Sequence, residues 1–404
     1  MSDPNPYFPP DLLIEILLKL PVKSLIRFLI ISKSWYSLIT KPSFISTYLT
    51  QKIKNTQNTL LVRHYNNSHN KEHYSLFQDI KNTPFSLNFS TELNFPLNCQ
   101  LGYFRIVGTC NGVVCLCDDL FGELKSLVLW NPSIQKITTL PLPLINPQSP
   151  HMFVLGFGGT TTTTNNNNNV DDVEYKLVRL VYHKKNDDGF ARYNIPPEVE
   201  IFSINTMVWR RVIGVEVKHC LVEFMWSQVF LNGAVHWIAY DVDPANGGVR
   251  SLVMSFSVGD EVFKEIMLPE GLVSEIATNL SVMVFEGLLC VVKYQREIDG
   301  GSCEVWVMKN YGVLESWSRL YRINLVEDME KVVGFRSNGE VLFSTKGNEM
   351  VCYDPNSGDK KDLGIRGSSR SFYVQNYVES LVLLKGNGVV SDEFLEGMGS
   401  LSMQ

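Results

Sequence analysis

Hydrophobic residues follow two different periods along this chain of 404 residues. Over the first 50 residues they recur at helical spacing, whereas from about residue 59 onward they form short apolar runs separated by polar turns. The change of period predicts a small all-α unit followed by a long all-β part. We expect the helical unit at 1–50, a linker at 51–58, the β part at 59–390 and a C-terminal tail at 391–404.

The helical unit is predicted to contain three short helices. The apolar positions at helical spacing in the first helix are Leu12, Leu13, Ile16, Leu17 and Leu20. Pro21 ends this helix, because proline lacks the backbone donor that a helix interior needs. A second helix is expected from about Val22, and a third from about Ser32 to a point before Pro42.

Apolar residues are unusually abundant in this unit. From Tyr7 to Leu49, 24 of 43 residues are apolar, about 56%, against 45% for the whole chain. A unit this small cannot usually bury so much apolar surface in a core of its own. The surplus predicts either contact with a partner protein or packing on the second part of the same chain. Composition leaves both alternatives open.

Strand-like segments repeat along the β part. Five similar units surround Trp130, Phe202, Phe256, Trp306 and Tyr353, at intervals of 72, 54, 50 and 47 residues. The long first interval contains threonine and asparagine runs, which predict a low-complexity loop insertion at 159–172. Tight turns before an apolar strand recur at Asn111-Gly112, Asn232-Gly233, Glu286-Gly287 and Asn338-Gly339.

A repeat near 50 residues is typical of a β-propeller with kelch-like blades. The five units predict five blades, and a sixth blade is expected to combine residues 59–65 with residues 371–384. Closing the ring with both ends of the chain would protect the edge strands. The predicted fold is therefore a small all-α unit of three helices followed by an all-β propeller of six blades.

Charge and cysteine content limit the possible partners. The net charge of −6 argues against a broad nucleic-acid surface. No apolar run approaches the roughly 18 residues that a membrane span needs, and the N-terminal segment lacks the basic start of a secretory signal. The eight cysteines form no C-x-x-C pair, so neither a zinc ribbon nor a disulfide scaffold is expected. These features predict a cytoplasmic or nuclear protein with no cofactor and with no nucleic acid or membrane as a partner.

The segment FPPDLLIEILLKLPVKSLIRFLIISKSW at 8–35 resembles an F-box. The positions that agree in register with the family pattern are Pro9, Asp11, Leu12, Glu15, Ile16, Leu17, Leu20, Pro21, Leu25, Arg27, Lys33 and Trp35. The stretch L-P-V-K-S-L at 20–25 is typical of plant members. Phe8 and Ile31 replace the usual leucine and valine, and Leu29-Ile30 stands where plant members often carry a basic residue and a cysteine.

An F-box binds a Skp-type adaptor, which links it to a cullin–RING ubiquitin ligase. The resemblance implies that apolar anchors on helices form this contact. The residues expected to form or support the adaptor-binding face are Pro9, Leu12, Ile16, Leu20, Pro21, Leu25, Ile31 and Trp35. For Leu17, Phe28 and Trp35, packing inside the core of the F-box itself is an equally good interpretation.

The β part resembles the F-box-associated domain of plant F-box proteins. The motifs that carry the likeness include G-T-C-N-G-V-V-C-L at 108–116, L-W-N-P-S at 129–133, G-F-G at 156–158, V-F-L-N-G-A-V-H-W at 229–237 and Y-V-E-S-L-V-L-L at 377–384. The threonine and asparagine runs after G-F-G depart from the short loop that is usual there. S-locus F-box proteins of pollen and F-box regulators of immune receptors are similar to this chain over nearly its whole length.

No motif in the β part supports an enzyme. His69 and His73 have metal-ligand spacing but lie in a turn-like segment, and Cys115 and Cys117 are expected to pack in the core. Recognition is assigned to the loops at 191–197, 241–248 and 295–301, since propeller loops carry binding residues.

Two aromatic residues are candidate anchors for a target in these loops. Tyr193 and Tyr240 have the large amphipathic side chains that dominate many interfaces. They could equally pack within the blades.

Together these patterns predict a non-catalytic substrate-recognition subunit of a Skp–cullin–F-box ubiquitin ligase. The propeller is expected to bind a target protein, whose identity the sequence does not reveal, for ubiquitination and proteasomal degradation. The alternative is an adaptor-bound scaffold without a degradative role, or a propeller that binds a glycan.

Overall fold

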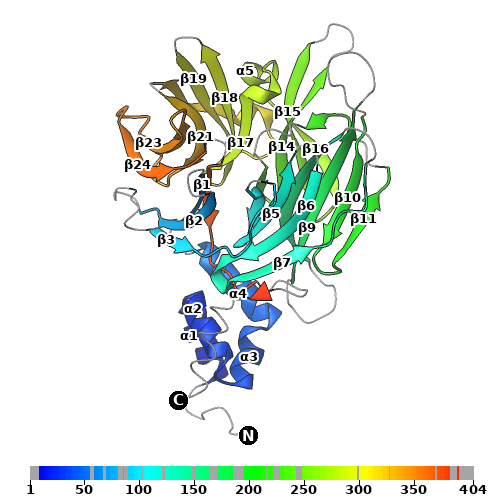
Figure 1. Ribbon diagram of the computed structural model, residues 1–404, viewed down its shortest axis with the longest axis vertical. Coiled ribbons are helices and arrows are strands. Elements are labelled where there is room, and N and C mark those ends of the chain that lie inside the picture. Colours follow the sequence, from blue (N-terminus) through cyan, green and yellow to red (C-terminus); the bar gives the residue numbers. More distant parts are fainter. Residues whose placement is uncertain are drawn as a thin grey trace.

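The structure is a computed structural model. It describes residues 9–54, 59–66, 70–80, 85, 90–101, 103–120, 123–147, 151–162, 172–184, 195–214, 217–221, 228–242, 248–297, 300–326, 328–368, 371–382 and 389–390. A helical unit lies at one end of a β-propeller (Figure 1). The helices of this unit are α1 (Pro10–Lys19), α2 (Val22–Leu29), α3 (Lys33–Ile39) and α4 (Pro42–Lys54).

The prediction of three helices is wrong by one. Pro42 does stop the preceding helix, but it also occupies the first position of α4. Proline is tolerated there because its missing N–H would have no partner within the helix anyway. Helix α4 continues to Lys54 and therefore crosses the boundary expected at residue 50.

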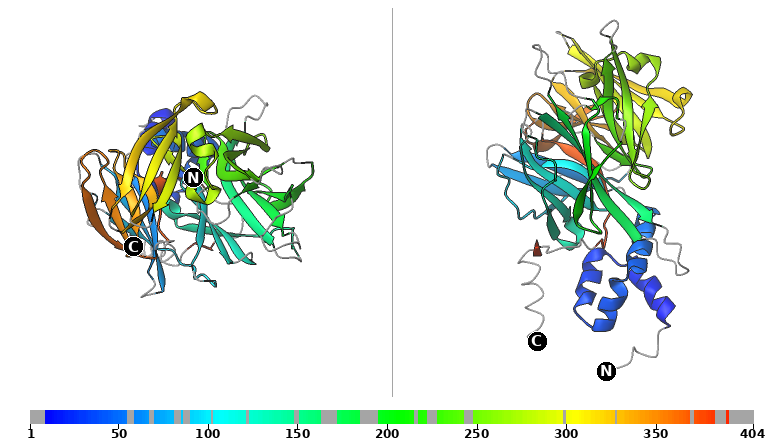
Figure 2. Two further views of the ribbon diagram at one scale, coloured as in Figure 1. Left: turned by 90° about the horizontal axis from the view of Figure 1, so that it is seen from above. Right: turned by 90° about the vertical axis from the view of Figure 1, so that its right-hand side faces the viewer.

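The strands form six antiparallel sheets arranged in a ring (Figure 2). From the inner to the outer strand, blade 1 contains β25 (Tyr373–Tyr377), β1 (Thr59–Asn66), β2 (Lys71–Gln78) and β3 (Ser90–Leu93). Blade 2 contains β4 (Arg105–Cys110), β5 (Val113–Leu120), β6 (Glu123–Asn131), β7 (Lys136–Leu140) and β26 (Val389–Val390). Blade 3 contains β8 (His151–Thr162), β9 (Asp172–His183), β10 (Glu198–Ser203) and β11 (Val208–Val212).

The other three blades follow in chain order. In blade 4, β12 (Cys220–Leu221) and β13 (Val229–Leu231) both pair with β14 (Ala234–Val242), which is followed by β15 (Val249–Ser257) and β16 (Val262–Met267). Blade 5 contains β17 (Leu280–Phe285), β18 (Leu288–Glu297), β19 (Gly300–Met308) and β20 (Trp317–Leu325). Blade 6 contains β21 (Met329–Phe335), β22 (Val341–Thr345), β23 (Glu349–Tyr353) and β24 (Lys360–Arg366). The predicted six-bladed propeller is confirmed.

Both ends of the propeller sequence contribute to blade 1. Strand β25 pairs with β1 in antiparallel register, with Val62 opposite Val374. This is the combination of segments predicted for the sixth blade. The pairing covers an edge of β1 that would otherwise expose unpaired backbone groups.

The five repeat units correspond to the third strands β6, β10, β15, β19 and β23. Both residues of Asn111-Gly112, Asn232-Gly233 and Glu286-Gly287 have positive φ, as expected for tight turns between the first and second strands. In blade 3 the corresponding connection is 163–171, which lies outside the described residues. Strands β8 and β9 extend to Thr162 and from Asp172, so the strands take up part of the insertion predicted at 159–172.

The propeller core is divided among the interfaces between blades. Six hydrophobic clusters each join two neighbouring sheets, and the sixth of them connects blade 1 with blade 2. Gly156 shows how closely two blades approach, because a Cβ at this position would lie 2.3 Å from the ring of Trp237 in blade 4. The ring is therefore held together by packing between sheets, and no blade has a complete core of its own.

Candidate functional site

Several large apolar side chains remain exposed on the helical unit. We call these residues the exposed apolar set: Leu12, Ile16, Ile30, Ile31 and Tyr36. Leu12 and Ile16 are four positions apart in α1 and therefore share one face of that helix. Ile31, between α2 and α3, is 65% exposed. Large exposed apolar groups on a small unit indicate a surface that binds another protein.

The predicted adaptor-binding residues fall into three groups. Leu12, Ile16 and Ile31 are exposed, and so are Pro9 and Pro21. Leu20 and Trp35 are half-buried, and both pack partly against the core of the helical unit. Leu25 is completely buried.

Leu25 is therefore placed to support the predicted binding face from the core and not to form its surface. Val22, Leu25 and Ile26 form the buried stripe of α2 and pack in the core of the helical unit. Periodicity alone could not separate this stripe from the outer surface, because apolar residues occur on both sides of these helices.

Two members of the exposed apolar set were not among the predicted residues. Ile30 was noted only as a departure from the family pattern, and Tyr36 follows the last matching position. The sequence feature that could have indicated Ile30 was its large apolar side chain at a position where plant members often carry a cysteine.

Asn131 connects the propeller to the helical unit. Its buried side-chain amide donates hydrogen bonds to the main-chain oxygens of Ser380 (3.2 Å) and Val382 (3.0 Å). Leu381, between these two residues, is buried in the core of the helical unit, together with Ile134 from the short helix η2 (Pro132–Ile134). Part of the apolar surplus is thus buried against the chain's own propeller, while the exposed apolar set stays uncovered.

Helix α4 strengthens this connection. Its Ile45 packs against the hydrophobic cluster between blades 2 and 3. One turn further along α4, the buried Tyr48 donates a hydrogen bond of 2.9 Å to the main-chain oxygen of Leu20 at the end of α1. Burial raises the pKa of Tyr48 well above its ordinary value, so the hydroxyl remains a donor.

The described strand ends that flank the predicted recognition loops lie on the propeller face away from the helices, whereas residues 191–194, 243–247 and 298–299 of these loops lie outside the described part of the chain. Strands alternate in direction within each blade, so connections between second and third strands emerge opposite those between third and fourth strands. The element η2, which contacts α2, joins the third and fourth strands of blade 2. The loops predicted at 191–197, 241–248 and 295–301 each join second and third strands.

Of the two tyrosines predicted as anchors in these loops, the structure describes one. Tyr193 lies outside the described residues. The placement of Tyr240 in a loop is wrong, because Tyr240 belongs to β14 and pairs with Cys220. Its half-buried side chain packs against the clusters on both sides of blade 4, which is the blade-packing alternative.

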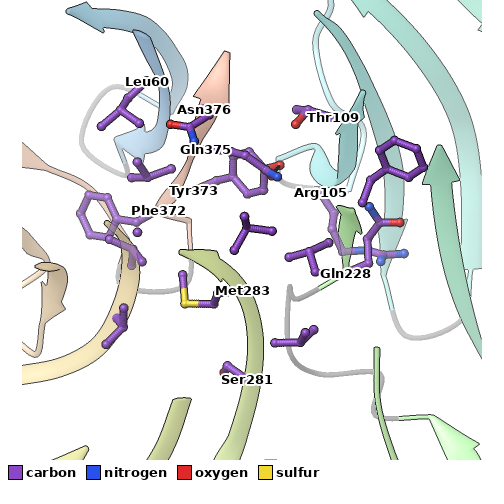
Figure 3. Close-up of a pocket in the computed structure, with 18 of the residues that line it drawn as sticks. Leu60, Arg105, Thr109, Gln228, Ser281, Met283, Phe372, Tyr373, Gln375 and Asn376 are labelled. Atoms are coloured by element: carbon purple, nitrogen blue, oxygen red, sulfur yellow. Dashed lines mark hydrogen bonds between the residues drawn. The ribbon is translucent and has the colours of Figure 1, made fainter. Parts of the chain in front are cut away.

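A cavity of about 1090 Å³ runs along the propeller axis (Figure 3). Inner strands β4, β13, β17, β21 and β25 contribute its lining. Arg105 and Asp119 lie near the face that carries the second-to-third-strand loops, whereas Asn111 and Gly112 lie in a turn on the side of the helices. The cavity therefore spans the propeller from one face to the other.

Potential metal-binding side chains are scattered in the described part of the chain. The described residues include no group of three or more histidine, cysteine or acidic side chains that could hold a metal ion. His73 lies in strand β2, where its ring stacks on His64 at 4.9 Å, and His69 is outside the described part. None of the described helices is long and apolar enough to span a membrane.

The cysteines are unsuited to nucleophilic chemistry. All eight lie in the described part of the chain, none forms a disulfide, and seven are buried. Burial raises the pKa of Cys110, Cys303 and Cys352 to about 12. These thiols stay protonated near neutral pH and are poor nucleophiles. Cys115 and Cys117 pack between blades 2 and 3, as expected for core residues.

Two family profiles match this chain. Residues 64–384 match the F-box associated beta propeller domain, and residues 7–47 match the F-box domain. The second match contains all members of the exposed apolar set.

Relatives from Arabidopsis thaliana match most of the chain. The F-box protein At3g07870 is 28% identical, over 90% of this chain and 89% of the relative. The F-box protein CPR1 is 24% identical, over 93% and 88% respectively. The F-box/kelch-repeat protein At3g23880 is 27% identical, over 87% and 88%.

Proposed function

This chain belongs to the family of plant F-box proteins with an F-box associated β-propeller domain, and from this premise we propose that it is the substrate-recognition subunit of a Skp–cullin–F-box ubiquitin ligase. In this role the helical unit binds the Skp-type adaptor and the propeller binds a target protein. The chain contributes no catalytic group. It brings the target close to the ubiquitin-conjugating enzyme, and proximity accelerates the transfer.

The exposed apolar set is the observation that carries the adaptor contact. Leu12 and Ile16 are each 43% exposed. Contact of these apolar side chains with water is unfavourable in the isolated chain, and a partner helix that covers them would remove this free-energy cost. Pro9 and Pro21 extend the same exposed apolar character along the N-terminal side of α1 and α2. Leu25 supports this face from the core.

The connection between the helices and the propeller supports the geometric part of the proposal. A target can be ubiquitinated efficiently only if it is held at a defined position relative to the ligase. The shared core around Ile134 and Leu381 restricts rotation of the helical unit on the propeller. The target is proposed to bind at the opposite face, where the second-to-third-strand loops emerge.

Adaptor binding is tested by replacing one exposed apolar residue with aspartate. Ile16→Asp is expected to weaken binding of the full chain to a plant Skp-type adaptor about tenfold or more, measured by calorimetry. Ile213→Asp is the matched control, because Ile213 directly follows strand β11 of the propeller and its side chain is 95% exposed. Equal affinity of the two folded variants would refute the proposed contact.

Target degradation is tested separately in plant cells. A protein enriched on the full-length Ile16→Asp variant, and on the wild-type chain only when the proteasome is inhibited, would support a degradative role. Its half-life should lengthen when the Ile16→Asp variant replaces the wild type. If partners respond to neither treatment although the adaptor binds, a scaffold or a glycan-binding propeller accounts better for the chain.

A further inference from the structure

The axial cavity of the propeller has the size of a site for a small organic molecule. Pockets for such ligands usually enclose roughly 300–1,000 Å³ and are mostly apolar, with a few oriented polar groups. The cavity here measures about 1090 Å³. Val282 from β17 and Val374 from β25 give it apolar walls. Met283, also from β17, lies in the same lining (Figure 3).

The charged groups of the lining balance one another. Arg105 and Lys331 are opposed by Asp119 and Glu330. The guanidinium of Arg105 is already engaged, because its Nε donates to Asp119 Oδ1 at 2.9 Å and a terminal nitrogen donates to Asp119 Oδ2 at 2.6 Å. The four formal charges sum to zero and Arg105 is already paired, so a charged ligand would lose its hydration without meeting a net counter-charge, and the lining favours an uncharged one.

Gln228 supplies an oriented polar group. Its Oε1 accepts a hydrogen bond of 2.7 Å from the backbone N–H of Phe157 in blade 3. The Nε2 atom is buried and has no hydrogen-bond partner among the described residues, and the whole residue is only 7% exposed. Such an unpaired buried donor is costly, and an acceptor atom on a ligand would remove that cost.

The neighbouring backbone makes room for this amide. A Cβ at Gly108 in β4 would lie 2.0 Å from Gln228 Nε2, so only glycine permits the observed position. The register of β4 against β5 is irregular at this point, between Ile106 and Gly108. A bulge next to an unpaired donor is typical of a strand adapted to a site.

From the size, charge balance and unpaired donor, we propose that the axial cavity binds an uncharged, largely apolar organic molecule that presents an acceptor oxygen to Gln228. This site is distinct from the adaptor contact proposed above, because it uses no residue of the helical unit. Bound there, the molecule would contact inner strands of several blades at once and stabilise the closed ring.

Nile red is a suitable probe, since it is an uncharged aromatic dye with a carbonyl oxygen and its emission rises in apolar surroundings. The full chain is expected to bind it at one saturable site. Met283→Trp, which fills the cavity, should weaken the affinity about tenfold or more. Val262→Trp adds the same side chain on the outer strand β16, where Val262 is exposed, and should leave the affinity unchanged.

A second cavity-filling variant keeps the test valid if Met283→Trp does not fold. Asn376 lines the cavity from β25 and is exposed, so Asn376→Trp can fill the space without disturbing the core. Circular dichroism and thermal melting establish that each variant is folded. The proposal is overturned if wild type binds no dye, or if both folded cavity variants bind it as well as Val262→Trp, since the dye would then occupy the outer surface. Equally tight binding of an anionic dye of similar size would overturn the assigned ligand class.

Discussion

The side-chain amide of Asn131 donates a hydrogen bond of 3.2 Å to the main-chain oxygen of Ser380, which lies 249 residues further along the chain. Asn131 ends strand β6 of blade 2, and the residue after Ser380 is buried in the core of the helical unit. This single side chain therefore joins the propeller, the C-terminal segment and the helices. The motifs L-W-N-P-S and Y-V-E-S-L-V-L-L, distant in sequence, meet at this contact.

Replacing Asn131 with alanine should loosen this junction. The carbonyl groups of Ser380 and Val382 would lose a buried donor, at an expected cost of about 1–3 kcal/mol in the free energy of unfolding. Denaturant unfolding measures the loss. Asn310→Ala, at an exposed position between β19 and β20, is the control and should change stability by less than about 0.5 kcal/mol. Similar values for the two variants would show that the junction contributes little.

Truncation of the side chain to alanine should reduce stability at Leu25 and adaptor affinity at Ile31. Leu25→Ala removes methyl groups from a completely buried site and should destabilise the helical unit by about 2–5 kcal/mol. Ile31→Ala removes an exposed side chain, so stability should change by less than about 1 kcal/mol while affinity for the Skp-type adaptor falls. Thermal melting and calorimetry separate the two effects. A stable Leu25→Ala variant with lost adaptor binding would instead place Leu25 on the binding face.

Removal of Asp79 should destabilise the ring where blade 6 meets blade 1. Arg336 Nε lies 2.8 Å from Asp79 Oδ1, and the two side chains are only 3% and 1% exposed. Asp79 also accepts a hydrogen bond of 2.6 Å from the backbone N–H of Ser337. Asp79→Ala removes a carboxylate partner of a buried guanidinium and should cost about 3–5 kcal/mol.

Two further variants test whether the loss of stability in Asp79→Ala arises because the ion pair is buried. In the double variant Asp79→Leu with Arg336→Met no buried charge is left unpaired, so it should be more stable than Asp79→Ala alone. Glu349→Ala breaks the pair with Arg366, whose side chain is 70% exposed, and should cost less than about 1 kcal/mol. A double variant less stable than Asp79→Ala would contradict this account. All values come from denaturant unfolding.

Acid should destabilise the propeller through His236. Burial lowers its pKa from 6.5 to about 4, and its Nε2 lies 2.6 Å from the hydroxyl of Tyr311, which can donate to the neutral ring. Between these pH values the unfolded chain binds more protons than the folded chain. Stability is therefore kept above pH 6.5 and falls as the pH approaches 4, by up to about 3 kcal/mol for this residue.

The variant His236→Gln isolates this contribution, because glutamine does not titrate in this range. Unfolding free energies at pH 7 and pH 4.5 should differ less for the variant than for wild type. His64, whose pKa is also lowered to about 4 mainly by burial, should retain its own share of the acid loss in both proteins. An identical pH dependence would mean that His236 is not protonated on unfolding.

Local patterns were sufficient for the order and type of the elements. Helical spacing before residue 50, strand runs near Trp130, Phe202 and Phe256, and asparagine-glycine turns depend on neighbouring residues and on backbone preferences, which the sequence states directly. The pairing of β1 with β25 was also predictable, because an odd strand at each end of a repeat array must find a partner. The amino-acid sequence by itself thus determined a helical unit and a closed six-bladed propeller.

Only the tertiary structure decided which apolar residues are covered. Leu25 and Ile31 have similar hydrophobicity, yet one is buried and the other exposed, since burial depends on the angle at which α2 meets its neighbours. Tyr240 became a packing residue because β14 continues to Val242, past the start of the loop predicted at 241–248. The junction at Asn131, the ion pair of Arg336 and the unpaired amide of Gln228 each depend on groups brought together from distant parts of the chain. Such contacts depend on the exact positions that side chains take within the folded ring, which no local pattern records.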